Sequence, residues 1–263
     1  MKLTPQTPCL VTGASSGIGR EIALELARRK CRVAILARTE EALEELAREL
    51  EAAGGEALVT PADVRDEEAV AAAVQKAVET FGSLKLVVAN AGLGRYALVE
   101  EQPAEHVETT MRINYEGMTR TVRHALPHLL ENTPAHVVGL SSAAGLIPHR
   151  LASAYCASKA AINAYLATLR LEVFDRGVGV TWMCPGAVET LFTDKADFDP
   201  DSELPLLARW FVRHLTAEEV ARRTLAAVEK NEREVVMPLM MRFFAWTRRQ
   251  TPRFADWLNR KTG

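Results

Sequence analysis

Short apolar runs alternate along most of the chain with longer stretches whose apolar residues recur at helical spacing. Residues 32–36, Arg-Val-Ala-Ile-Leu, form an almost continuous apolar run, which is typical of a strand buried on both faces of a parallel sheet. The stretches between such runs are amphipathic, as in residues 40–52, where charged side chains separate the leucines. This alternation predicts an α/β fold with a doubly wound parallel sheet of the Rossmann type.

The same pattern predicts where each element begins and ends. Strands are predicted at residues 9–12, 32–36, 56–60, 84–89, 135–140, 178–183 and 234–237. Helices are predicted at residues 20–29, 40–52, 67–81, 103–130, 153–176, 206–215 and 216–230, the last of which begins with the capping box Thr216-Ala-Glu-Glu219. We therefore expect a single domain over residues 1–237, in which residues 188–215 form a substrate loop, and a helical C-terminal extension over residues 238–263.

Composition and charge narrow the class of protein further. The 263 residues are 48% hydrophobic and carry a net charge of −2, so the overall charge gives no indication of nucleic-acid binding. The four cysteines lack metal-ligand spacing; we expect no metal site and interpret them as apolar core residues in a reducing compartment. The N-terminus lacks an apolar signal segment, and no apolar run approaches the roughly 20 residues that span a bilayer. These features predict a cytoplasmic protein.

A glycine-rich segment joins the first predicted strand to the first predicted helix. It reads Gly13-Ala-Ser-Ser-Gly17-Ile-Gly19, a variant of the usual dinucleotide-binding spacing. Glycine permits a tight turn and lets the backbone approach a pyrophosphate, and the helix N-terminus supplies amide donors. The segment therefore predicts a dinucleotide site at the carboxyl end of the strand.

The second predicted strand ends in Ala37-Arg38-Thr39. An acidic residue at this position binds the 2′-hydroxyl of NAD, whereas an arginine accommodates the 2′-phosphate of NADP. Arg38 stands here, and the first acid after it is Glu40. The pattern favours NADP(H), with Ser15 and Thr39 as further hydrogen-bond donors; the alternative is a surface arginine at a strand end.

Tyr155 and Lys159 lie four residues apart on a predicted helix, so their side chains share one face. A phenol titrates near about 10, and an adjacent ammonium lowers that value, which makes Tyr155 a candidate general acid/base. Ser142 follows the preceding strand and can donate a hydrogen bond to a substrate oxygen. The alternative is a half-buried tyrosine beside a solvated lysine.

Asn114 lies inside the predicted helix 103–130. Asparagine is a poor residue for a helix interior because its side chain competes for backbone hydrogen bonds. From local sequence alone, Asn114 is either a kink or an exposed polar position, and an exposed position is favoured.

Together these residues resemble the short-chain dehydrogenase/reductase family over at least residues 8–230. The matching elements are Thr12-Gly13-x-x-x-Gly17-x-Gly19, Asp63-Val64, Asn90-Ala91-Gly92, Asn114, Ser142, Tyr155-x-x-x-Lys159 and Pro185-Gly186. Because the motifs are many and in order along the chain, they are far more specific than any of them alone.

The resemblance implies a role for each catalytic position. Tyr155 is expected to exchange the proton, and Ser142 to orient and polarise the carbonyl group. Lys159 is expected to lower the pKa of Tyr155 and to hold the nicotinamide ribose. Asn114 is expected to kink its helix so that a freed backbone carbonyl can hold a water molecule in a proton relay to Lys159, which replaces the exposed-position interpretation.

The resemblance also implies how the cofactor is bound. Residues 13–19 are expected to cradle the pyrophosphate, Asp63 and Val64 to meet the adenine, and residues 90–92 to line the ribose. Val188 and Thr190 are expected to face the carboxamide. The residues expected to contact NADP(H) are Gly13, Ser15, Ser16, Gly17, Ile18, Gly19, Arg38, Thr39, Asp63, Val64, Asn90, Ala91, Gly92, Tyr155, Lys159, Pro185, Gly186, Val188 and Thr190.

Within the family, the sequence after Lys159 and the extended C-terminus resemble the hydroxysteroid dehydrogenase and carbonyl reductase branch. This implies a ketone or aldehyde substrate, reduced to an alcohol, and a homodimer or homotetramer. A 3-oxoacyl reductase acting on acyl-carrier-protein or CoA substrates is an alternative, as is a catalytically idle NADP-binding regulator. Substrate choice is expected to depend on residues 93–99, 146–151 and 188–215.

The extension at residues 238–263 combines an apolar cluster with basic residues. It holds six arginine or lysine residues against one acid, Asp256. Thr251-Pro252 is typical of a helix start, so two short helices with a break are predicted. Aromatic residues interleaved with arginines suit peripheral contact with an anionic membrane or a lid over an apolar substrate. Docking on the core or on a partner subunit is an equally good alternative.

Overall fold

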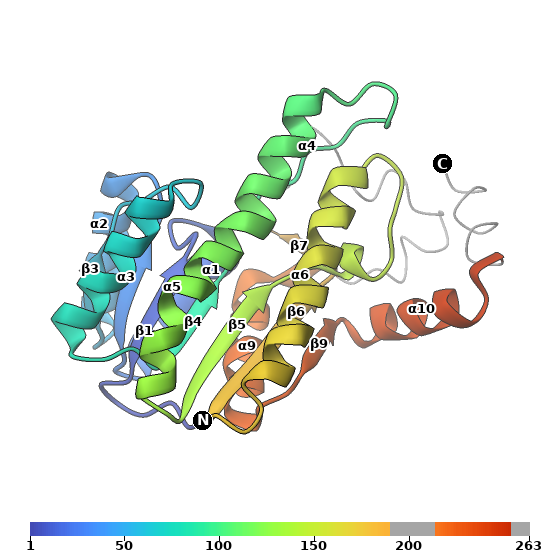
Figure 1. Ribbon diagram of the computed structural model, residues 1–263. Helices are drawn as coiled ribbons and strands as arrows, with labels where there is room; N and C mark the ends of the chain where they lie inside the picture. Colours follow the sequence, from blue (N-terminus) through green and yellow to red (C-terminus); the bar gives the residue numbers. More distant parts are fainter. Residues whose placement is uncertain (190–213, 254–263) are drawn as a thin grey trace.

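The computed structural model describes residues 1–189 and 214–253 as a parallel sheet between two layers of helices (Figure 1). The seven strands lie in the order β3-β2-β1-β4-β5-β6-β9, and every neighbouring pair is parallel. The strands are β1 Pro8–Thr12, β2 Arg32–Leu36, β3 Glu56–Val59, β4 Leu86–Ala89, β5 Ala135–Leu140, β6 Val178–Pro185 and β9 Glu234–Met237. The sequence prediction of a doubly wound parallel sheet is confirmed, with strand ends shifted by one or two residues.

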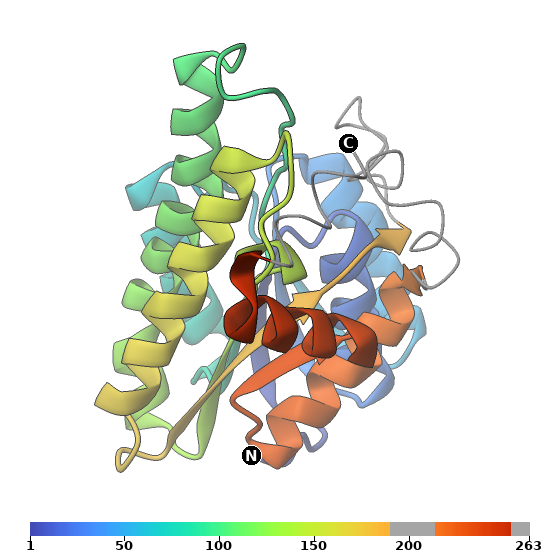
Figure 2. The same cartoon turned by 90° about the vertical axis from the view of Figure 1, so that its right-hand side faces the viewer.

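The helices divide between the two faces of the sheet (Figure 2). One face packs against α3, α5 and α6, and the other against α1, α2 and α9. The described helices are α1 Gly17–Arg28, α2 Glu40–Ala52, α3 Glu67–Phe81, α4 Ala104–Met111, α5 Gly117–Glu131, α6 Ser153–Glu172, α9 Ala217–Lys230 and α10 Leu239–Gln250. All four cysteines are buried, as predicted.

Two glycines let α6 lie unusually close to β5 and to the turn that follows it. A Cβ atom on Gly139, in β5, would overlap Leu166 Cδ1 of α6. A Cβ atom on Gly145 would lie 2.8 Å from the Lys159 carbonyl carbon. Because real Cβ atoms do not approach so closely, glycine at both positions sets how deeply α6 is seated on the sheet.

The predicted capping box at the start of α9 is confirmed. Glu219 N donates to Thr216 Oγ1 at 3.1 Å, and Thr216 N donates to Glu219 Oε2 at 3.1 Å. The predicted helix over residues 206–215 is wrong at its end, because Leu215 lies in a short strand. This strand, β8 (Leu215–Thr216), pairs with β7 (Val188–Glu189), and the Leu215 side chain is buried. His214 is not helical either, and residues 206–213 of that predicted helix, with most of the predicted substrate loop, lie outside the described residues.

The C-terminal extension begins with α10, which is the first of its two predicted helices. Thr251 is not helical, in agreement with the predicted break. The second predicted helix lies, after its first two residues, outside the described part of the chain.

His136 is a buried histidine in the first half of β5. Its Nε2 atom lies 2.8 Å from Thr181 Oγ1, and Thr181 donates its own proton to the Glu232 carbonyl. Its Nδ1 atom has no hydrogen-bond partner within the described residues and faces Gly179. Burial, with smaller contributions from the N-terminal ammonium and Arg170, lowers the pKa of His136 to about 3. The imidazole is therefore held neutral.

We predict that His136 makes the fold sensitive to acid. Because its pKa is lower in the folded than in the unfolded chain, the unfolded state binds more protons below about pH 6.5, so stability falls as pH drops from there towards 3. Between pH 7 and pH 5 this loss amounts to about 2 kcal/mol of unfolding free energy. Denaturant titration of the parent protein and of His136→Asn at several pH values measures this loss of unfolding free energy.

The variant His128→Gln is the matched control, since it removes an imidazole from the last turn of α5. It is expected to keep the acid sensitivity of the parent. If His136→Asn also keeps the acid sensitivity of the parent, His136 is not held neutral by burial.

Candidate active site

The glycine-rich segment folds as a tight turn between β1 and α1. Gly13 and Gly17 have φ values of +64° and +56°, in the region that disfavours other residues. A Cβ atom on Gly13 would lie 2.8 Å from Ala91 Cα, and one on Gly19 would overlap the Gly13 carbonyl oxygen. The Ser16 side chain makes no capping hydrogen bond to the described residues, so the first-turn amides of α1 are open to an anion. The cradle fits the pyrophosphate of a dinucleotide.

Residues at the end of β4 stabilise this glycine turn through hydrogen bonds. Asn90 Nδ2 donates to the carbonyl oxygens of Thr12 at 3.0 Å and Gly13 at 3.1 Å. Thr12 Oγ1 accepts from Asn90 N at 3.0 Å and Ala91 N at 3.1 Å. The Asn90 amide therefore stabilises the glycine turn, a role that sequence reasoning did not predict, and its expected place beside the ribose stays a prediction.

Charged side chains gather where β2 and β3 end. Arg38 and Thr39 follow β2 and are exposed. The Asp63 carboxylate accepts from Arg65 Nη2 at 2.7 Å and Nε at 3.0 Å. This hydrogen bonding, with a smaller contribution from Arg38, lowers the pKa of Asp63. Arg65 was not predicted as a site residue, although its position two residues after Asp63 could have indicated it.

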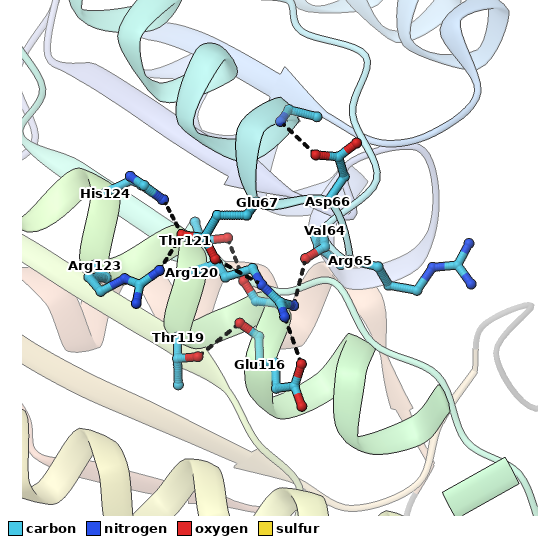
Figure 3. Close-up of polar contacts among 12 residues, drawn as sticks. Val64, Arg65, Asp66, Glu67, Glu116, Thr119, Arg120, Thr121, Arg123 and His124 are labelled. Atoms are coloured by element: carbon cyan, nitrogen blue, oxygen red, sulfur yellow. Dashed lines mark hydrogen bonds and ion pairs between the residues drawn. The ribbon is translucent and has the colours of Figure 1, made fainter. Parts of the chain in front are cut away.

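A polar network fixes Val64 against the start of α5 (Figure 3). Arg120 donates to Glu116 at 2.7 Å, to Glu67 at 3.2 Å and to the Val64 carbonyl at 3.4 Å. A Cβ atom on Gly117 would lie 2.8 Å from Val64 Cγ2, so the backbone of α5 rests directly on that side chain. The loop after β3 is thereby tied to the first turn of α5.

The predicted helix 103–130 is interrupted by a π-helical turn, Arg112–Glu116, that contains Asn114. Asn114 is fully buried, so the exposed-position interpretation is wrong. Its Oδ1 accepts from Leu93 N at 2.8 Å, and its Nδ2 donates to Leu93 O and to Ser158 Oγ, both at 2.9 Å. The side chain thus joins the segment after β4 to α6.

Ser158 lies between Tyr155 and Lys159 and was not predicted as a site residue. It is fully buried and donates to the Tyr155 carbonyl at 2.8 Å while accepting from Asn114. Its place three residues after Tyr155 on a helix is the signal that could have indicated this contact.

Tyr155, Lys159 and Ser142 come together at the end of β5. Lys159 Nζ donates to the Leu140 carbonyl at 2.7 Å and lies 5.7 Å from the centre of the Tyr155 ring. Ser142 Oγ accepts from Ala144 N at 3.1 Å and donates to the Pro185 carbonyl at 3.4 Å. All three side chains are buried or nearly so, which corrects the alternative of a solvated lysine.

Burial has the largest effect on the pKa values of Tyr155 and Lys159. It raises the pKa of Tyr155 well above that of a free phenol, with Tyr96 adding to the rise and hydrogen bonding to Ser142 opposing it. It also lowers the pKa of Lys159 to about 8. The pKa of Tyr155 thus lies above the ordinary phenol value in this structure because burial is the largest cause of its shift, and the expectation that Lys159 lowers it stays a prediction. A neutral phenol at pH 7 is a proton donor.

Two of the segments predicted to select the substrate lie beside Tyr155. Ala97 N donates to the Leu151 carbonyl at 2.8 Å, which joins residues 93–99 to residues 146–151. The Tyr96 ring centre lies 6.3 Å from that of Tyr155 and 6.2 Å from that of His149. Ala144, Ala152 and Cys156 pack in the same cluster. The surroundings of the phenol are therefore mainly apolar and aromatic.

The remaining predicted positions follow β6. Pro185 ends that strand, and Gly186 N donates to the Met237 carbonyl of β9 at 2.7 Å. Val188 begins β7. Thr190 lies outside the described residues.

Comparison with known proteins gives one matching family model and many relatives. The model described as short chain dehydrogenase matches residues 8–200. "Probable oxidoreductase EphD" of Mycobacterium tuberculosis (strain ATCC 25618 / H37Rv) is 39% identical over 68% of this chain, which spans only 31% of that protein. "11-beta-hydroxysteroid dehydrogenase A" of Sesamum indicum is 32% identical over 95% of this chain and 74% of its own length.

Solved structures match the whole fold. A short chain dehydrogenase/reductase from Burkholderia phymatum in complex with NAD gives a TM-score of 0.86 at 26% identity, covering 97% of this chain and 96% of that one. A short chain dehydrogenase from Burkholderia cenocepacia J2315 in complex with NADP gives a TM-score of 0.78 at 27% identity, covering 89% and 97%. Both nicotinamide dinucleotides are thus found among the neighbours.

Proposed function

The chain belongs to the short-chain dehydrogenase/reductase family of oxidoreductases, and on that premise we propose that it interconverts a ketone or aldehyde and an alcohol with NADP(H). The single observation that carries the proposal is the buried group of Tyr155, Lys159 and Ser142 at the end of β5. The braced glycine turn on β1 supports a dinucleotide in the same crevice.

In the direction of reduction, bound NADPH would supply a hydride to the carbonyl carbon. Tyr155 then donates its phenolic proton to the carbonyl oxygen, and the burial that keeps the phenol neutral favours this donor state. Ser142 donates a hydrogen bond to the same oxygen and orients the carbonyl group. Lys159 holds the ribose hydroxyls, and Asn114 keeps α6 in place through Ser158.

We propose an apolar substrate, such as a lipid-derived or steroid-like ketone. The aromatic and aliphatic surroundings of Tyr155 support this class, since such surfaces exclude water and accept hydrocarbon. The name of the sesame relative points to steroids as substrates of that protein. We also propose that the chain acts as a homodimer or homotetramer in the cytoplasm, a state that the family resemblance implies.

We propose a preference for NADP(H) over NAD(H). Arg38 is exposed at the end of β2, where an arginine can meet the 2′-phosphate with two charge-assisted hydrogen bonds. Arg65, which is paired with Asp63, offers a second guanidinium at the ends of β2 and β3. We also propose that Asp63 and Val64 meet the adenine and that residues 90–92 line the ribose, as the family resemblance implies.

Replacing Tyr155 by phenylalanine is expected to lower carbonyl reduction by at least about a hundredfold, because only the transferable proton is removed. NADPH consumption with a panel of apolar and small polar ketones measures turnover, and fluorescence titration measures NADPH binding, which should stay within about threefold. Tyr165→Phe, which removes a hydroxyl from the same helix, is the control and should leave turnover unchanged.

Retention of more than a tenth of the turnover in Tyr155→Phe would show that another group supplies the proton. If the unmodified protein binds NADPH tightly but reduces none of the ketones, it is better described as a catalytically idle NADP-binding regulator.

Replacing Arg38 by aspartate is expected to weaken NADPH binding by about 10- to 100-fold, the effect of losing a charge-assisted contact. NADH binding should change much less, because NADH lacks the 2′-phosphate. Arg48→Asp, on the exposed side of α2, makes the same change of net charge and serves as the control. Equal affinities of the unmodified protein for NADPH and NADH would contradict the proposed preference.

A further inference from the structure

Helix α10 carries a row of apolar side chains on its outer side. Leu239, Met240, Phe243 and Trp246 are 76%, 39%, 59% and 60% exposed. Their spacing places them along one face of the helix, and the rings of Phe243 and Trp246 are stacked with centres 6.2 Å apart. Figure 2 shows α10, in dark red, on the outside of the molecule in front of β9 and α9. Large apolar side chains gathered in this way on a surface mark an interaction site.

The opposite side of α10 is attached to the rest of the protein. Met241 lies against Gly186, where an added Cβ atom would be 3.5 Å from Met241 Cγ. Near the other end of the helix, Arg248 Nη1 donates to the Pro148 carbonyl at 3.4 Å. These contacts fix the inner side of α10 to the rest of the protein. The apolar row therefore lies on the outer side of a docked helix.

The charges on α10 have a single sign. The helix holds Arg242, Arg248 and Arg249 and no acidic residue, although the chain as a whole carries a net charge of −2. Arg242 and Arg249 are exposed and lie seven residues apart, so they fall on the same side of the helix. That side is about a quarter turn from the line through Phe243 and Trp246. The apolar row is thus bordered by two guanidinium groups.

We propose that the outer side of α10 binds the surface of an anionic lipid bilayer. Leu239, Met240, Phe243 and Trp246 enter the boundary between headgroups and acyl chains, while Arg242 and Arg249 reach the lipid phosphates. No helix within the described residues is long and apolar enough to cross a membrane. Helix α10 has 12 residues and is about 18 Å long, which is short of the roughly 30 Å bilayer core, so it lies along the surface. A second copy of the chain fits less well, because two such faces in contact would bring four arginines together.

The proposal has a consequence for the active site, which rests on the proposed function. The Pro148 carbonyl that accepts from Arg248 belongs to the segment that carries His149, whose ring lies beside that of Tyr96. The Tyr96 ring in turn lies beside that of Tyr155. Because Arg248 lies on the inner side of α10, a bilayer bound to the outer side is separated from this segment by the width of the helix. An apolar ketone dissolved in the membrane could enter the site from that side.

The test is sedimentation of the full chain with two kinds of vesicle, one of phosphatidylcholine alone and one containing phosphatidylglycerol. We expect binding to the anionic vesicles that weakens with added salt, and at least about tenfold weaker binding for Phe243→Ser/Trp246→Ser and for Arg242→Gln/Arg249→Gln. The control Leu171→Ser/Phe174→Ser removes two side chains that are 78% and 71% exposed near the end of α6, and it should bind as the parent does.

Circular dichroism and thermal unfolding of each variant establish that it remains folded. Absence of binding to anionic vesicles, or equal loss of binding in the α6 control, would overturn the proposal. So would a Phe243→Ser/Trp246→Ser variant that binds vesicles normally but turns an oligomer into a monomer, because the face would then be a contact between copies. Vesicle binding does not depend on turnover, so failure of the proposed activity would leave this result unchanged.

Discussion

The buried ammonium of Lys159 is the interaction on which the candidate site depends. Its side chain sits below the surface of the fold, with Nζ donating to the Leu140 carbonyl at 2.7 Å. A buried cation loses its hydration, which lowers its pKa to about 8. The buried ammonium is stabilised only if α6 packs closely on β5, so that Nζ reaches the Leu140 carbonyl. Gly139 and Gly145 make this close packing possible because they have no side chains.

The neighbouring contacts keep α6 in this position. Ser141 Oγ donates to the Lys159 carbonyl at 3.1 Å, and Asn114 Nδ2 donates to Ser158 Oγ at 2.9 Å. The π-helical turn, the end of β5 and the face of α6 are therefore one connected polar arrangement inside an apolar shell. The same burial that lowers the pKa of Lys159 raises that of Tyr155, so the phenol keeps its proton and the site favours proton donation.

The strands and the glycine turn could be predicted from the sequence, because apolar runs and glycine spacing are local signals. The π-helical turn could not be predicted from the local pattern, which is continuously helical over residues 103–130; only the family resemblance implied a kink at Asn114. The interruption accompanies hydrogen bonds from Asn114 to Leu93 and Ser158, which are distant in sequence. The rise that burial causes in the pKa of Tyr155 could not be predicted either. A lysine four residues away is visible in the sequence, whereas the depth to which the phenol is buried is a property of the packed fold.

The most direct measurement is an NMR titration of lysine labelled with ¹³C at Cε and tyrosine labelled at Cζ, with Lys159→Arg and Tyr155→Phe used for assignment. We expect Lys159 to titrate near pH 8, below the value of about 10.4 for a lysine in a model peptide. We expect Tyr155 to remain protonated beyond the ordinary phenol value of 10.0. Titration of Lys159 at the model-peptide value of about 10.4, or of Tyr155 near neutral pH, would contradict a site whose protonation is set by burial.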